Sequence, residues 1–132
     1  MSEENVELMR QALAALLRRD RPAWLALHDE DMEAIPIRDW PESEVRGREA
    51  VWDFMVKMID AWDPAPISDV EFRDAGADKV LAHQSADFRG RGSGAEVEFE
   101  YWVVSTIQDG KIRRGQWFVD RAEALEAAGL SE

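Results

Sequence analysis

The chain has 132 residues, of which 45% are hydrophobic and 33% charged, a composition typical of one soluble globular domain spanning 1–132. Its 28 acidic residues outnumber its 16 basic residues, and the net charge of −12 argues against nucleic acid and anionic membranes as partners. Cysteine is absent, which excludes disulfides, thiol nucleophiles and thiolate metal sites. The chain begins without a signal-peptide pattern and has no apolar run long enough to span a membrane, so the expected location is the cytoplasm.

The first half of the chain has mostly helical periodicity. Apolar residues recur with helical spacing from about Glu3 to Arg19, which predicts an amphipathic helix. Pro22 opens a short second helix, and Met32 to Ile37 is a brief strand candidate. A third helix is predicted to begin near Gly47 and to end before Pro64.

The second half of the chain changes to the period of strands. Ile67–Asp74 and Lys79–Arg89 are predicted strands, and a glycine-rich turn at Gly90–Gly94 leads into a hairpin. After the hairpin, Asp120 begins a capping box and Gly129 marks the end of a terminal helix. Segregated helices and strands of this kind predict an α+β domain in which helices pack against a curved antiparallel sheet.

The stretch from 95 to 120 predicts two long strands joined by a two-residue turn at Asp109-Gly110. Counting from that turn places Ser105 opposite Arg114 and Trp102 opposite Trp117. One face of the hairpin is apolar with isolated polar groups, which favours a pocket lining. That face carries Phe99, Tyr101, Ser105, Arg114, Gln116 and Phe118. Trp102 and Trp117 share the other face, where an exposed aromatic pair favours a dimer contact.

Four segments together resemble a known family. They are Asn5-Val6-Glu7-Leu8, Gly47-Arg48-Glu49-Ala50-Val51, Asp109-Gly110-Lys111-Ile112 and the ending from Asp120 to Leu130. With them, the chain resembles the SnoaL-like branch of the nuclear transport factor two superfamily, which includes ketosteroid isomerases. The resemblance implies a cone-shaped, barrel-like domain enclosing one deep pocket, often assembled as a homodimer through the outer sheet face. The fold hosts many reactions and also plain binders.

Two catalytic patterns of the superfamily are missing here. Ketosteroid isomerases carry a carboxylate base on or just after the short strand that follows the second helix, whereas this chain reads Ala34-Ile35-Pro36-Ile37-Arg38-Asp39. Epoxide hydrolases of this fold place arginine before aspartate on one strand, whereas this chain has the reverse order, Asp87-Phe88-Arg89. Neither mechanism transfers to this chain.

His83 and Asp120 are the candidate catalytic residues. If the glycine-rich turn places Arg89 opposite Ala95, His83 lies opposite Tyr101 on the pocket face, where an imidazole suits proton transfer. The alternative is a satisfied or exposed histidine. Asp120 could orient or replace His83, but capping the last helix is a sufficient reason for it. The second histidine, His28, is expected at the surface.

The remaining polar residues of the pocket face are candidate ligand contacts. Arg114 needs an anionic partner if buried, so it pairs with an acid, binds a ligand carboxylate or enolate, or is solvated. Tyr101 and Gln116 could donate hydrogen bonds to an oxyanion or serve as ordinary core groups. Phe99, Ser105 and Phe118 complete the expected substrate-binding set.

Two hypotheses of function follow. The first is a cofactor-free isomerase, cyclase or hydratase that acts by proton transfer on an apolar carbonyl compound. The second is a non-catalytic ligand-binding or dimerisation module of the same fold. Both take a small apolar organic molecule as partner, both predict a homodimer through the face of Trp102 and Trp117, and neither needs a metal or cofactor.

Overall fold

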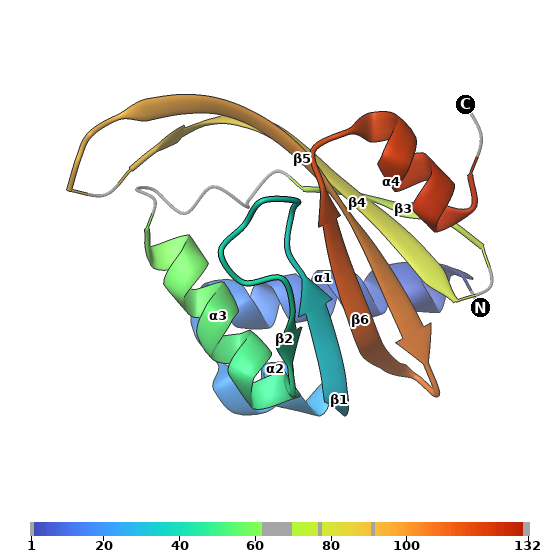
Figure 1. The fold of residues 1–132 in the computed structure, drawn as a ribbon. Coiled ribbons are helices and arrows are strands. Elements are labelled where there is room, and N and C mark those ends of the chain that lie inside the picture. The colour runs from blue at the N-terminus through green and yellow to red at the C-terminus, as the bar shows by residue number, and fades with distance from the viewer. Residues whose placement is uncertain (1, 62–69, 77, 91, 131–132) are drawn as a thin grey trace.

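A computed structural model describes residues 2–61, 70–76, 78–90 and 92–130 (Figure 1). Its helices are α1 Ser2–Arg18, α2 Arg21–Ala26, α3 Arg48–Asp60 and α4 Arg121–Ala128. Its strands are β1 His28–Ile35, β2 Val45–Arg46, β3 Glu71–Asp74, β4 Lys79–Arg89, β5 Glu96–Gln108 and β6 Lys111–Phe118. The first three helices lie on one side of the sheet and α4 lies on the other, which confirms the predicted α+β class (Figure 1).

The six strands form one open, mixed sheet in the order β2-β1-β6-β5-β4-β3. Because β2 and β3 are its edges, the sheet is not closed into the barrel that was expected. The antiparallel prediction is also wrong at one pair, since β1 runs parallel to β6. These two strands are far apart in the sequence, and no local pattern reveals which distant strand pairs with which.

Local signals explain where the helices begin and end. The Asp20 carboxylate accepts a hydrogen bond from the Ala23 amide at 3.3 Å and caps α2. Gly47 precedes α3 with a φ of 92°, a conformation that favours glycine. Helix α4 ends as predicted at Gly129, with a φ of 75°. The predicted end of the third helix at Pro64 and residues 67–69 of the next predicted strand lie outside the described residues.

The β5–β6 hairpin contains an irregularity that the sequence does not signal. The predicted turn is confirmed: Asp109 and Gly110 have φ angles of 54° and 77°. Ile107 pairs with Ile112 as predicted, but Thr106 then pairs with Arg114, which leaves Arg113 as the extra residue of a β-bulge. Every pair beyond the bulge is therefore shifted by one residue from the predicted register. Because side chains alternate along a strand, the residues of β6 that were expected on the inner face lie on the outer face.

The β4–β5 hairpin also differs by one residue from the prediction. Arg89 pairs with Glu96 rather than with Ala95, because the turn is one residue longer and closes with a 2.8 Å bond from the Gly90 amide to the Ala95 carbonyl. His83 therefore pairs with Trp102 and not with Tyr101.

Two apolar clusters cover the two faces of the sheet. The larger one fills the space between the sheet and α1–α3, with Trp24, Val51, Val80 and Ile112 among its most buried members. The smaller one lies under α4 and contains Leu81, Trp102, Val104 and Leu125. Burying a large apolar side chain contributes roughly 1.5–3 kcal/mol, so both clusters hold the helices in place.

Candidate functional site

A cavity of about 110 Å³ lies inside the larger cluster, between the inner face of the sheet and α1–α3. Its walls are mostly aliphatic and aromatic, and the polar residues among them are His28, Tyr101 and Ser105. The lining residues are Met9, Ala12, Leu13, Leu16, Trp24, His28, Met32, Val51, Met55, Val70, Phe72, Ala82, Tyr101, Val103, Ser105, Ile112, Gly115 and Trp117. An apolar cavity with a few polar groups is the usual form of a small-molecule site.

His28 is the polar group that the local structure fixes most firmly. Its ring is 3% exposed and stacks on the Trp24 indole, with centroids 3.6 Å apart and planes 21° apart. Its Nδ1 lies 2.7 Å from the Trp24 carbonyl oxygen. Because a carbonyl only accepts, Nδ1 carries the proton and Nε2 carries the lone pair in the neutral ring. No described residue hydrogen-bonds to Nε2.

The surroundings of His28 favour its neutral form. Burial lowers the pKa of His28 to about 4, and the nearby Arg48 guanidinium acts in the same direction. Arg48 is held there by hydrogen bonds from its Nη1 to the carbonyl oxygens of Leu25, at 3.1 Å, and His28, at 3.4 Å. At neutral pH the cavity therefore contains an uncharged imidazole with one fixed tautomer.

Tyr101 and Gln84 form a second polar element, on neighbouring strands β5 and β4. The Tyr101 hydroxyl donates a 2.7 Å hydrogen bond to Gln84 Oε1, and Gln84 is almost completely buried. Burial raises the pKa of Tyr101 to about 12, so the phenol keeps its proton. With that proton donated to Gln84, the phenol oxygen is left with acceptor capacity.

Aspartate, glutamate, lysine and arginine are absent from the described lining of this cavity. Among the described residues there is also no group of three or more histidine, cysteine or acidic side chains arranged to hold a metal ion. Within the same part of the chain, no helix has the length and hydropathy needed to cross a membrane. The chemistry of the cavity thus comes from neutral groups.

The predicted pocket residues divide between the two faces of the sheet. Tyr101 and Ser105 line the cavity, and Phe99 stacks on Tyr101 with centroids 5.8 Å apart. The predicted position of His83 in the pocket is wrong: its Nε2 lies 2.7 Å from Glu100 Oε2, and its ring stacks on Trp102, on the opposite face. The longer β4–β5 turn is the reason, since it shifts the register by one residue.

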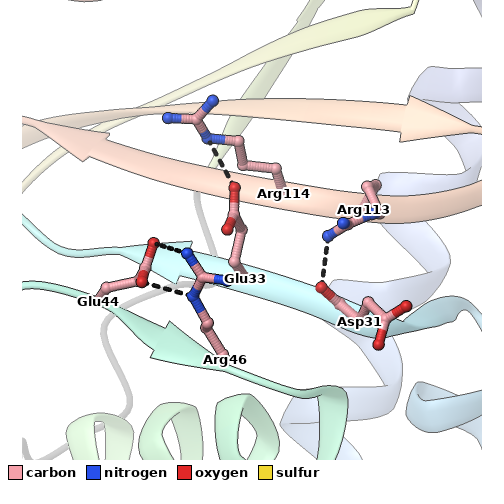
Figure 2. A network of polar contacts seen from close by, with 6 residues as sticks. All are labelled: Asp31, Glu33, Glu44, Arg46, Arg113 and Arg114. Atoms are coloured by element: carbon pink, nitrogen blue, oxygen red, sulfur yellow. Dashed lines mark hydrogen bonds and ion pairs between the residues drawn. The ribbon is translucent and has the colours of Figure 1, made fainter.

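Arg114, Gln116 and Phe118 also lie on the outer face, contrary to the prediction, because the bulge at Arg113 turns them outward. Figure 2 shows Arg114 beside Glu33 of β1, with Nε 3.5 Å from the carboxylate, and Arg113 donating to the Asp31 carbonyl. Arg114 is therefore an ion-paired, partly exposed residue rather than a pocket cation.

Glu33 also faces strand β2 in this outer network. Its neighbour there, Arg46, forms a two-pronged pair with Glu44 at 2.6 and 3.3 Å (Figure 2). The hydrogen bond from Arg46 lowers the pKa of Glu44. The outer face of the sheet at β2, β1 and β6 thus carries charged side chains.

Two further predictions concern Asp120 and the tryptophan pair. Asp120 caps α4 by accepting a 3.0 Å bond from the Glu123 amide, as its capping-box position indicates.

Trp102 and Trp117 do not share a face: Trp102 is buried under α4, whereas Trp117 lines the cavity. The predicted dimer surface carrying both is wrong for the same reason, the bulge in β6, and homodimerisation itself stays a prediction.

His28 is the cavity residue that sequence reasoning missed. It was assigned to the surface because three acidic residues follow it. A usable signal was present: His28, Met32 and Ala34 have even spacing and form the buried side of β1. His28 also follows Trp24 by four residues, the spacing at which the ring meets the last turn of α2.

The fold and the cavity together define an α+β protein with an apolar internal site. The family model of the SnoaL-like domain matches residues 9–115, and the chain belongs to this family. The resemblance inferred from the sequence is confirmed. A search of curated protein sequences gives no significant match.

Solved structures with the same fold cover nearly the whole chain. An NTF2-like protein from Burkholderia xenovorans has a TM-score of 0.80 at 25% identity, over 97% of each chain. The Mycobacterium tuberculosis protein Rv0760c, in complex with estradiol-17β-hemisuccinate, has a TM-score of 0.68 at 19% identity, over 90% of this chain and 95% of its own. TerC, co-crystallised with polyporic acid, has a TM-score of 0.65 at 17% identity, over 96% of this chain and 98% of its own. The last two likenesses show the shared fold.

Proposed function

We propose that this protein is a cofactor-free enzyme that removes a proton from an apolar carbonyl compound bound in the cavity, with His28 as the base. The observation that carries this proposal is the hydrogen bond from His28 Nδ1 to the Trp24 carbonyl, which leaves the Nε2 lone pair free on a residue that lines the apolar cavity. Two proteins of the same fold are seen with estradiol-17β-hemisuccinate and with polyporic acid, and these ring-containing oxygen compounds support this class of substrate.

The basicity of His28 narrows the substrate class further. A base whose pKa is about 4 removes protons efficiently only from carbons that are themselves acidic. Carbons that are flanked by two carbonyls, or by a carbonyl and an aromatic ring, meet this requirement. The second polar element of the cavity, Tyr101 with Gln84, accepts a hydrogen bond from a hydroxyl or enol at the other end of such a molecule.

Hydrogen–deuterium exchange of 2-tetralone in D₂O, followed by proton NMR, tests the proposal. This bicyclic ketone is apolar and carries an acidic benzylic CH₂ next to its carbonyl. Since general-base catalysis contributes roughly 10²–10⁴-fold, His28→Gln should reduce the enzyme-dependent exchange rate by about a hundredfold or more. Circular dichroism of each variant verifies that the fold is retained.

His83→Gln is the matched control, because His83 is the other histidine of the chain and lies on the outer face. It should leave the exchange rate unchanged. The catalytic roles of His83 and Asp120 stay predictions of the sequence, and a rate that falls with His83→Gln but not with His28→Gln would support them and refute the role of His28.

A second candidate function is ligand binding without catalysis. The observation in its favour is that the Tyr101 proton is already donated to Gln84, so the described lining offers little to stabilise a developing enolate. Isothermal titration with 2-tetralone separates the two functions. Binding that depends on His28, without any exchange above the buffer rate, would assign the protein as a binder.

A further inference from the structure

A groove of about 500 Å³ lies outside the cavity, where strand β6 meets helix α4. It is lined by residues 35–40, Ser43, residues 116–119 and Glu123. The groove exists because β1 stays paired with β6 only as far as Ile35 and Gln116. Beyond this pair the chain leaves the sheet and returns to it as β2, as Figure 1 shows. Residues 117–119, at and after the end of β6, therefore line the groove instead of pairing with β1. We call this space the β6 groove.

Trp117 is common to the β6 groove and the cavity. Its indole lies close to the backbone of Gly115: a β-carbon at Gly115 would be 3.2 and 3.3 Å from two carbons of the ring. Gly115 itself lines the cavity. A single, half-buried aromatic side chain therefore stands between an internal space and an external one, and glycine at position 115 makes room for it.

The walls of the β6 groove suit an apolar chain with a solvent-facing end. Val119, which is 51% exposed, contributes an aliphatic side chain to the lining. Trp40, another lining residue, is held edge-on to Phe54 of α3, with ring centroids 6.5 Å apart. The lining also contains the Arg38–Glu123 ion pair, at 2.6 Å, with side chains 78% and 42% exposed. The groove thus offers apolar contacts together with a charged pair that is open to solvent.

We propose that the β6 groove is the outer half of the ligand site. In this proposal the Trp117 side chain is the partition between the cavity and the groove, and its size limits which ligands extend from one into the other. This inference rests on the proposed function, in which the reacting, oxygen-bearing part of the ligand lies in the cavity with His28 and Tyr101. The occupant of the groove is the apolar tail of the same ligand. The ligand class is therefore an elongated molecule with a hydroxyl or enol at one end and a hydrocarbon tail at the other.

Volume and length both support this class of ligand. The cavity alone, at about 110 Å³, is smaller than typical ligand sites of about 300–1,000 Å³, whereas the cavity and the groove joined past Trp117 fall within that range. His28 is the register partner of Ile112, and Trp117 lies four ladder positions further along β6 because Arg113 is the extra residue of the bulge. At about 3.3 Å per ladder position, the backbones at the head and the partition are roughly 13 Å apart.

Calorimetric binding of phenol and 4-decylphenol tests the proposal. Phenol fits the inner cavity with its hydroxyl donated to His28 Nε2, whereas the tail of 4-decylphenol is long enough to extend past Trp117 into the β6 groove. Each methylene buried tightens binding about fourfold. Val119→Asp should therefore weaken 4-decylphenol by about tenfold or more and leave phenol unchanged, since Val119 is outside the cavity lining.

Leu17→Asp is the matched control: Leu17 is also a large exposed aliphatic residue, 38% exposed, but it lies on α1 away from the groove. It should change the affinity of neither phenol. Equal affinity of the wild-type protein and Val119→Asp for 4-decylphenol would overturn the inference, while the proposed function stands as long as phenol binds through His28. Absence of phenol binding to the wild-type protein would instead overturn the proposed function, and the inference with it.

The role of Trp117 as the partition has its own readout. Trp117→Phe shortens the side chain between the two spaces, so the association rate of 4-decylphenol in stopped-flow measurements should rise relative to that of phenol. An unchanged ratio of the two rates would refute the partition.

Discussion

The buried imidazole of His28 should make the stability of the protein depend on pH in a way that one substitution removes. The pKa of His28 is lowered from 6.5 to about 4 in the folded chain, chiefly by burial. Between these two values the unfolded chain binds more protons than the folded one, so the free energy of unfolding falls as the pH falls through this window. Below about pH 4 both states are protonated and the effect levels off.

The magnitude follows from the same two pKa values. Linkage gives a loss of roughly 2 kcal/mol from His28 alone between pH 7 and pH 5, and about 3 kcal/mol when the whole window is crossed. At a urea m-value of about 2 kcal/mol/M, the loss at pH 5 shifts the unfolding midpoint by about 1 M.

Urea unfolding at pH 5, 6, 7 and 8, followed by tryptophan fluorescence, measures this effect. The quantity compared is the decrease in the free energy of unfolding between pH 7 and pH 5, in the wild-type protein and in His28→Gln. Carboxylates and other groups also contribute to the pH dependence, but they are common to all variants. The decrease between pH 7 and pH 5 should be about 2 kcal/mol smaller in His28→Gln than in the wild-type protein. Parallel pH profiles for the wild-type protein and His28→Gln would refute the buried, neutral imidazole.

Three further predictions concern the cavity and the last helix. The phenolate absorbance of the native protein should titrate near pH 12, because Tyr101 is the single tyrosine of the chain and its pKa is raised to about 12; a midpoint near 10 without unfolding would contradict its burial. Gly115→Ala should destabilise the protein by about 1–3 kcal/mol in chemical denaturation, because the new methyl group crowds the Trp117 ring, and an unchanged midpoint would mean that the ring moves freely. Gly129→Ala should cost about 1–2 kcal/mol in the same assay, because Gly129 has a φ of 75°; a neutral result would mean that α4 can end differently.

Local chemistry made most of the fold predictable from the sequence. Strand β4 has the predicted bounds, Lys79–Arg89, and the Asp109-Gly110 turn has the positive φ angles that its residues favour. Asp120 and Gly129 mark the two ends of the last helix as predicted. These features depend on residues that are close in sequence, so composition and spacing are sufficient to find them.

The candidate site was harder to predict because it depends on counting residues across turns. One extra residue in the β4–β5 turn moves His83 from the inner to the outer face, and the bulge at Arg113 does the same to Arg114 and Gln116. Neither irregularity has a local sequence signal. His28 was missed for another reason: the parallel pairing of β1 with β6 buries it, and pairing between distant strands is set by packing of the whole chain.

The bulge at Arg113 also has a consequence for how the cavity can change over generations. Deleting this one residue would restore a regular ladder and leave Gly115 opposite Ser105 and Trp117 opposite Val103, so the cavity wall would stay the same. If the bulge instead closed with Arg113 retained and paired with Thr106, Arg114 and Gln116 would turn to the inside and Trp117 to the outside. An aromatic wall would then be replaced by a cation and an amide. In a fold that supports many kinds of chemistry, the pairing register of one strand is thus a heritable property that can change the class of ligand in one step.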